Sequence, residues 1–113
     1  HLRKERVAIT KSNKTDTKYL IAEIDGNPVG VVGWCYINKN HIRFKTAYVN
    51  NAFRGKKIYS NLWIKRNFLI LKDKQVNIIT AYCTNMSLPK FLKDGFIVQS
   101  VRNNISYVKK QIL

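Results

Sequence analysis

The sequence predicts a single α/β domain in which a mostly antiparallel sheet is interrupted by one strand–helix–strand crossover. Three observations lead to this fold class: strand-like apolar stretches occupy most of the chain, turn residues separate them at short intervals, and one central stretch has helical spacing instead. A chain of 113 residues, of which 45% are hydrophobic, can build one core but not two. We therefore expect residues 1–113 to form one domain, with a partly loose segment at residues 1–17.

The first half of the chain is predicted to be an antiparallel meander. Asp25 and Gly26 favour a tight hairpin turn, because glycine supplies the positive φ that such turns need. A second turn is expected at residues 38–40. The strands are expected over residues 6–10, 18–24, 29–37 and 41–49.

The second half of the chain predicts the crossover. Between residues 56 and 72, apolar residues recur at i, i+4 and i+7, and the cations among them lie mostly off this stripe. A β-branched strand over residues 76–83 follows, and this order of elements implies a parallel pairing. A short helix near residues 87–93 should end at Gly95, a usual C-cap residue. Two last strands are expected over residues 96–101 and 105–110.

The aromatic residues of the meander bear on whether its surface could stack with RNA bases. They lie at even spacings within each strand, so one buried face explains them without a ligand. We therefore expect a buried aromatic face and do not favour RNA stacking there. These residues are Trp34, Tyr36, Phe44 and Tyr48.

The charge of the chain is strongly positive, at +15, from 21 Lys and Arg against 6 Asp and Glu. Such a charge favours a polyanionic partner: nucleic acid, an acidic protein or an anionic cofactor. The excess of Lys over Arg also fits the codon bias of an AT-rich genome, whereas base-specific readers usually depend on Arg. Both explanations stay open, so nucleic acid is a possible partner.

Several classes of protein are disfavoured by what the sequence lacks. Cys35 and Cys83 are far apart in apolar stretches, so we expect two buried free thiols rather than a disulfide. His1 and His41 have no paired cysteine spacing near them, so we expect no metal site. No apolar run approaches 18 residues and no signal-peptide pattern appears, so we expect a cytoplasmic protein without a membrane partner.

A candidate phosphate-binding loop lies in NNAFRGKKIYSNLW, residues 50–63. A predicted strand leads there into an Arg-Gly step and then a helix N-terminus, where unpaired backbone N–H groups and the helix dipole attract anions. Gly55 allows a close bend, and Arg54, Lys56 and Lys57 add positive charge. Any basic loop before a helix would look similar, so this stretch alone is a weak signal for a phosphate site.

Two stretches resemble signatures of the GCN5-related N-acetyltransferase (GNAT) superfamily. VNNAFRGKKIYSNL resembles the segment written V-x-P-x-Y/F-R-G-x-G-I/L-G/A-x-x-L, and NMSLPKFLKDGF resembles the second signature, which ends in Gly-Phe. The order of the predicted elements matches as well, and the resemblance covers roughly residues 18–110. Matching positions are Val49, Phe53, Arg54, Gly55, Ile58 and Leu62, then Ser87, Leu92, Gly95 and Phe96, with Asn85 one residue closer than usual.

The resemblance implies acetyl-coenzyme A as the cofactor. In that family the pyrophosphate lies on the backbone amides after the Arg-Gly step. The pantetheine arm pairs with the end of the preceding strand, where the two parallel strands splay and leave a slot for the thioester. By position, the cofactor-binding candidates are Val49 for the pantetheine backbone, Arg54, Gly55, Lys56, Lys57, Ile58 and Tyr59 for the pyrophosphate, and Asn85 or Ser87 for the pantetheine amides.

The sequence departs from the family pattern inside the predicted loop. Lys57 occupies the position of a second Gly, and it keeps its N–H while adding a charge. Tyr59 replaces a small residue and either narrows the cofactor slot or points into the acceptor site. Asn51 replaces a Pro, which costs some rigidity.

Further departures concern catalysis. The family often uses a Tyr as general acid at the position of Phe91, which lacks the hydroxyl. No Asp or Glu lies between Asp25 and Asp73 to serve as a base, and His41 is interpreted as a surface-turn histidine.

The remaining catalytic candidates are Tyr82 and Cys83, on the strand after the phosphate helix, and Tyr59. Because side chains alternate along a strand, one of Tyr82 and Cys83 should face the slot. The alternative is that neither is catalytic, with Tyr82 a core aromatic residue and Cys83 a core thiol.

The sequence thus predicts a GNAT-like acetyl-coenzyme A-dependent N-acyltransferase with an amine acceptor, possible acceptors being nucleic acid, aminoacyl-tRNA or protein lysine. The N-terminal helices of the family are expected to be missing or reduced to residues 1–17. Either they have been trimmed from a longer chain that began before His1, or the acceptor site is open. The alternative is a non-catalytic module of the same fold that binds nucleic acid or a protein through its basic surface. The sequence leaves the acceptor and the oligomeric state open.

Overall fold

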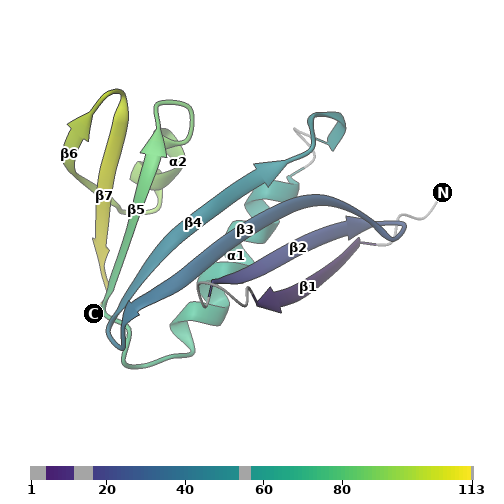
Figure 1. Ribbon diagram of the computed structural model, residues 1–113, viewed down its shortest axis with the longest axis horizontal. Helices are drawn as coiled ribbons and strands as arrows, with labels where there is room; N and C mark the ends of the chain where they lie inside the picture. The colour runs from purple at the N-terminus through teal and green to yellow at the C-terminus, as the bar shows by residue number, and fades with distance from the viewer. Residues whose placement is uncertain (1–4, 12–16, 54–56, 113) are drawn as a thin grey trace. The chain divides into compact units, whose positions relative to one another are not determined.

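The computed structural model describes residues 5–11, 17–53 and 57–112 (Figure 1). The strands are β1 (Glu5–Lys11), β2 (Lys18–Ile24), β3 (Asn27–Asn38), β4 (His41–Val49), β5 (Ile78–Thr84), β6 (Ile97–Arg102) and β7 (Ile105–Gln111). The helices are α1 (Ile58–Leu71) and α2 (Leu88–Lys93), with a 3-10 turn over Asn51–Phe53.

The strands follow the order β1-β2-β3-β4-β5-β7-β6 in one sheet. The pairing of β4 with β5 is parallel, and the pairs β1–β2, β2–β3, β5–β7 and β6–β7 are antiparallel. The chain divides into a first unit of residues 1–35 and 45–73 and a second unit of residues 36–44 and 74–113.

The first unit begins with the hairpins of the meander. Asp25 and Gly26 have φ values of 52° and 82°, so the turn between β2 and β3 uses the left-handed region at both positions. This turn type matches the right-handed twist of the strands it connects. The register of β2 against β3 shifts between Ala22 and Glu23, which marks a bulge.

Helix α1 approaches β3 closely at Gly30. A Cβ at that position would lie 3.2 Å from Ile58 Cγ2, 3.2 Å from Leu62 Cδ1 and 3.3 Å from the carbonyl oxygen of Tyr48. Ile58 and Leu62 are buried in this contact, and each such side chain contributes roughly 1.5–3 kcal/mol by leaving water. Glycine in β3 therefore sets how closely the N-terminal half of α1 can approach the strand.

One cation of α1 is a core residue. Arg66 is only 1% exposed, and its Nη1 donates a hydrogen bond to the carbonyl oxygen of Gly33 at 3.2 Å. Its guanidinium carbon lies 4.9 Å from the centre of the Trp63 ring, an attractive cation–π geometry. Arg66 is therefore an exception to the expectation that the cations of this helix lie mostly off its apolar stripe.

The second unit holds the parallel crossover pairing. His41 to Phe44 of β4 pair with Ile78 to Ala81 of β5, and β5 continues to Thr84. Along its other edge, β5 pairs with β7 over its whole length. The turn between β6 and β7 has positive φ at Asn103 and Asn104, a conformation that asparagine tolerates well.

An aromatic cluster fixes α2 against the strands of the second unit. The ring centres of Phe44 and Phe91 are 6.3 Å apart, those of Phe44 and Phe96 are 5.8 Å apart, and those of Phe91 and Phe96 are 5.0 Å apart. Gly95 ends α2 with a φ of 97°, as the sequence predicts.

The fold class predicted from the sequence is confirmed, including the meander, the crossover and the terminal hairpin. The prediction that one buried face accounts for the meander aromatics is wrong for two of them. Trp34 and Phe44 are buried, but Tyr36 is 39% exposed and Tyr48 is 52% exposed. Even spacing predicts which side chains share a face, whereas burial also requires an element that covers that part of the face.

Candidate functional site

The chain leaves β4 through a hydrogen-bonded turn centred on Asn50. The amide of Asn50 donates to the carbonyl oxygen of Val29 at 2.7 Å, and its side-chain oxygen accepts from the amide of Ala52 at 3.0 Å. The amide of Phe53 donates to the carbonyl oxygen of Asn50 at 2.9 Å. Val49, the predicted pantetheine residue, is the buried last residue of β4. Sequence reasoning did not single out Asn50, although an Asn that bonds the backbone two residues on is a common turn device.

Of the predicted phosphate site, the structure describes the residues at the start of α1. Lys57 is the N-cap, with φ 63° and ψ 15° in the left-handed region, and its carbonyl oxygen accepts from the amide of Asn61 at 3.0 Å. No acidic residue lies in the first turn, so no side-chain carboxylate competes for the positive end of the helix dipole. The other predicted phosphate residues, Arg54, Gly55 and Lys56, lie outside the described residues.

The next two predicted residues differ in burial. Ile58 is buried beneath α1. Tyr59 is half-buried, and its ring meets the ring of Trp63 edge-on, with centres 5.8 Å apart and planes at 79°. Its bulk is therefore supported by a neighbour one turn along the helix.

The predicted pantetheine residues Asn85 and Ser87 lie in the turn between β5 and α2. The Ser87 hydroxyl donates to the carbonyl oxygen of Thr84 at 3.3 Å and lies 3.3 Å from the Thr84 hydroxyl. The Ser87 amide also donates to that carbonyl oxygen, at 3.2 Å. Asn85 is exposed. Ser87 thus holds the turn together, whereas the side chain of Asn85 is exposed to solvent.

Tyr82 and Cys83 point to opposite faces of β5, as alternation along a strand requires. Cys83 is a buried free thiol, and burial raises its pKa, so the thiol stays protonated near neutral pH. Cys35 is the other buried free thiol. Tyr82 is 59% exposed, and its ring lies 4.8 Å from that of Tyr107 on β7.

His41 is more enclosed than the sequence suggests. It is the half-buried first residue of β4, and its Nε2 lies 2.7 Å from the hydroxyl of Thr80 on β5. Burial, and then the positive charges of Arg43 and Lys109, hold the pKa of His41 below its ordinary value of 6.5. His41 is therefore a strand histidine that favours the neutral form, and not a surface-turn histidine.

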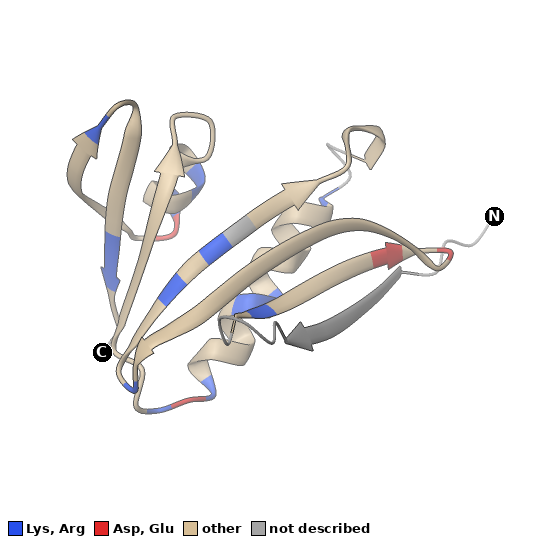
Figure 2. Cartoon of the chain, in the orientation of Figure 1, with Lys and Arg blue, Asp and Glu red and all other residues tan. Residues whose placement is uncertain are grey.

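Positive side chains occur on both helices and on most strands of the described chain (Figure 2). Among the described residues, no group of three or more His, Cys, Asp or Glu side chains could hold a metal ion. No helix in the described ranges is long and apolar enough to cross a membrane.

Comparison with known proteins identifies the fold as that of the GNAT-family acetyltransferases. The sequence matches no protein-family model and no curated protein, so this likeness rests on structure. Identities to the solved structures below are all under 25%.

A GNAT-family acetyltransferase from Elizabethkingia anophelis, solved with acetyl-CoA bound, superposes with a TM-score of 0.74 at 11% identity, over 96% of this chain and 98% of that one. The PaiA N-acetyltransferase of Thermoplasma acidophilum, in complex with coenzyme A, gives 0.73 at 19% identity. That match covers 85% of this chain but only 61% of PaiA, which is less than two thirds of its length. The N-acetyltransferase PseH of Campylobacter jejuni, in complex with acetyl coenzyme A, gives 0.64 at 24% identity, over 86% and 69% of the two chains.

Proposed function

We propose that this protein is an acetyl-coenzyme A-dependent N-acyltransferase that acts on an amine. The observation that carries the proposal is the start of α1. A left-handed Lys57 leads into a first helical turn without acidic residues, within the first of the two GNAT-like motifs. Similar structures solved with the coenzyme bound support the same assignment.

The residues at this helix start fit a pyrophosphate. Backbone N–H groups in the first turn of a helix point outward along its axis, and the dipole adds positive potential there. The exposed Lys57 adds a cation at the N-cap, where its backbone is in the left-handed region. We assign the pyrophosphate to this turn, with Arg54, Gly55 and Lys56 as further contacts by their positions in the motif, and the pantetheine backbone to Val49.

The chemistry falls to groups of this chain once the thioester is positioned. Acetyl-coenzyme A supplies an acyl group that is already activated, so positioning alone can accelerate transfer considerably. We assign proton donation to the Tyr82 hydroxyl rather than to the Cys83 thiol. Tyr82 is exposed, whereas Cys83 is buried with a raised pKa. Phe91 is held in the aromatic cluster and has no hydroxyl to offer.

Calorimetric titration tests the cofactor assignment. Acetyl-coenzyme A and ATP are titrated into the purified protein at one fixed salt concentration, because a basic surface binds any polyphosphate weakly. We expect micromolar binding of acetyl-coenzyme A and much weaker binding of ATP. Equal weak binding of both would contradict the proposal and favour the non-catalytic module.

A transfer assay tests the role of Tyr82. Release of the coenzyme thiol is followed with a panel of amines that includes lysine-rich peptides, polyamines and aminoacyl-tRNA. For the acceptor that supports turnover, Tyr82→Phe should lower kcat by roughly 10²-fold or more, with little change in acetyl-coenzyme A affinity. Tyr107→Phe is the matched control and should keep its kcat. An unchanged kcat in Tyr82→Phe would remove Tyr82 from the reaction.

A further inference from the structure

One face of the sheet in the second unit carries an ordered set of basic and aromatic side chains. The strand registers place Arg43, Thr80 and Lys109 opposite one another across β4, β5 and β7. Two residues along, Tyr82 pairs with Tyr107, and two residues further Thr84 and Arg102 both pair with Ile105. Successive rows are roughly 7 Å apart, because a strand rises about 3.3 Å per residue. The tyrosine row thus has cations on both sides, and we call this surface the tyrosine face.

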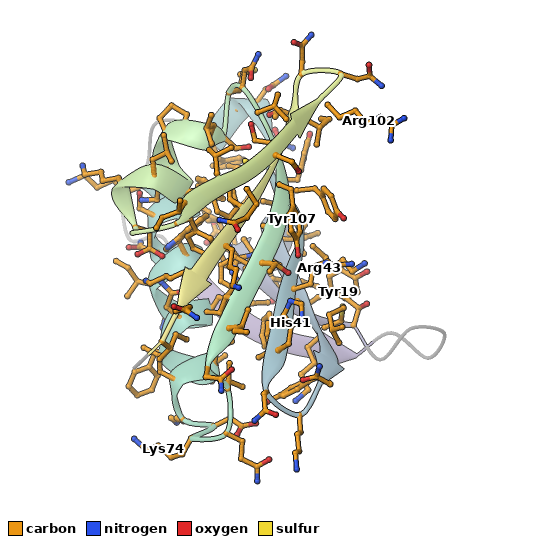
Figure 3. The ribbon with its side chains drawn as sticks, turned by 90° about the vertical axis from the view of Figure 1, so that its left-hand side faces the viewer. Tyr19, His41, Arg43, Lys74, Arg102 and Tyr107 are labelled. Carbon is orange, nitrogen blue, oxygen red and sulfur yellow. The ribbon has the colours of Figure 1, made fainter. Side chains whose placement is uncertain are left out.

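The rings of Tyr82 and Tyr107 contact each other on this face. Their ring centres are 4.8 Å apart with planes inclined by 37°, and Tyr82 is exposed over more than half of its surface. The guanidinium carbon of Arg43 lies 5.3 Å from the centre of the Tyr82 ring. A guanidinium beside aromatic rings is the combination on which nucleobases stack in single-strand-binding proteins. Figure 3 shows Arg43 and Tyr107 on one side of the strands, with Arg102 beyond Tyr107 and Lys74 at the opposite end.

The cations of this face are not neutralised by the acidic residue of their own unit. Asp94 is the sole acidic residue in the sequence of residues 36–44 and 74–113. Its carboxylate lies 3.3 Å from Nζ of Lys110, which points to the face opposite that of Lys109. The Nε of Arg43 is buried and makes no hydrogen bond to any described residue. The Asp94 carboxylate therefore does not neutralise Arg43, Lys109 or Arg102.

We propose that the tyrosine face is a binding surface for single-stranded nucleic acid. Bases stack on Tyr82 and Tyr107, and phosphates contact Arg43, Lys109 and Arg102. Single strands are favoured over duplexes, because only unpaired bases expose their faces to aromatic side chains. They are favoured over acidic peptides because a peptide carboxylate uses the cations but leaves the rings without a stacking partner. This binding does not depend on acyl transfer.

Fluorescence anisotropy with labelled oligo(U) and oligo(dT) tests the stacking. We expect Tyr107→Ser and Tyr82→Ser each to lower affinity roughly ten-fold, which corresponds to the loss of one stacked base. Tyr107→Phe and Tyr82→Phe keep the ring and should bind close to the wild type. Tyr82→Phe should therefore bind nucleic acid like the wild type while losing acyl transfer. If the nucleic-acid proposal is wrong, the serine variants bind like the wild type. If the role of Tyr82 in the enzyme is wrong, Tyr82→Phe keeps its kcat.

The salt dependence of binding tests the phosphate contacts. Lys109→Gln should reduce the slope of log K against log salt by about 0.7, as expected for one phosphate contact on a single strand. Lys74→Gln removes the same charge at the opposite end of the unit and should leave the slope unchanged. Serine variants that bind like the wild type would overturn the proposal, as would a duplex or polyglutamate that binds as tightly as the single strands.

Discussion

At the residue scale, the departures from the family pattern fall on positions with defined structural roles. Lys57 takes the left-handed conformation that a glycine would adopt easily, and Phe91 fills an aromatic cluster. The sequence identified both positions because the motifs fix their register. It could not show that the Asn50 amide donates to Val29 or that Arg66 is buried, since both depend on distant chain segments, Val29 and Gly33.

Lys57→Gly should raise the free energy of unfolding by about 0.5–1 kcal/mol, because a side chain in the left-handed region costs energy that glycine avoids. Urea denaturation measures the difference. The same substitution at Lys65, an exposed position inside α1, should lower stability by about 1 kcal/mol through the loss of helix propensity. A loss of stability at both positions would show that the left-handed conformation of Lys57 carries no strain.

His41 should make the protein less stable as the pH falls. Its pKa in the folded state is below 6.5, so below that pH the unfolded chain binds more protons than the native one. The stability contributed by neutral His41 is therefore complete above pH 6.5 and decreases as the pH falls towards the folded-state pKa. His41→Gln keeps a polar partner for Thr80 and should show a shallower decline between pH 7.5 and pH 5 in urea denaturation. Equal declines in both proteins would contradict the prediction.

At the element scale, strands and helices were predictable because each has a strong local signal. Asp25-Gly26 set the hairpin turn, and the change of apolar period set the crossover helix. The placement of α1 on β3 was not predictable, because it depends on Gly30, whose importance appears only when Ile58 and Leu62 are seen above it.

Gly30→Ala should destabilise the protein by about 1–3 kcal/mol, since the new methyl group meets two side chains at 3.2 Å and a carbonyl oxygen at 3.3 Å. The start of α1 must then move, so acetyl-coenzyme A affinity should fall as well. Thermal unfolding and calorimetry measure the two effects. Gly26→Asn is the control, because no atom lies within 4 Å of an added Cβ there and Asn tolerates positive φ. A Gly30→Ala protein as stable as Gly26→Asn would show that α1 has room to move.

At the scale of the whole molecule, the fold is that of the GNAT-family acetyltransferases, and the sequence predicted it from two short motifs and the order of the elements. The tyrosine face was not predicted. Its residues come from β4, β5 and β7, and only the strand registers reveal that they form rows. The net charge of +15 follows from the composition, whereas the arrangement of the charges depends on the fold.

Backbone amide NMR tests whether the first turn of α1 binds the pyrophosphate of the coenzyme. Acetyl-coenzyme A is titrated into ¹⁵N-labelled protein, with ATP in a parallel titration at the same salt concentration. We expect the largest saturable shifts at the amides from Lys57 to Asn61. These shifts should saturate at micromolar concentrations of acetyl-coenzyme A and only at far higher concentrations of ATP. Small shifts spread over many basic residues, the same for both ligands, would contradict it.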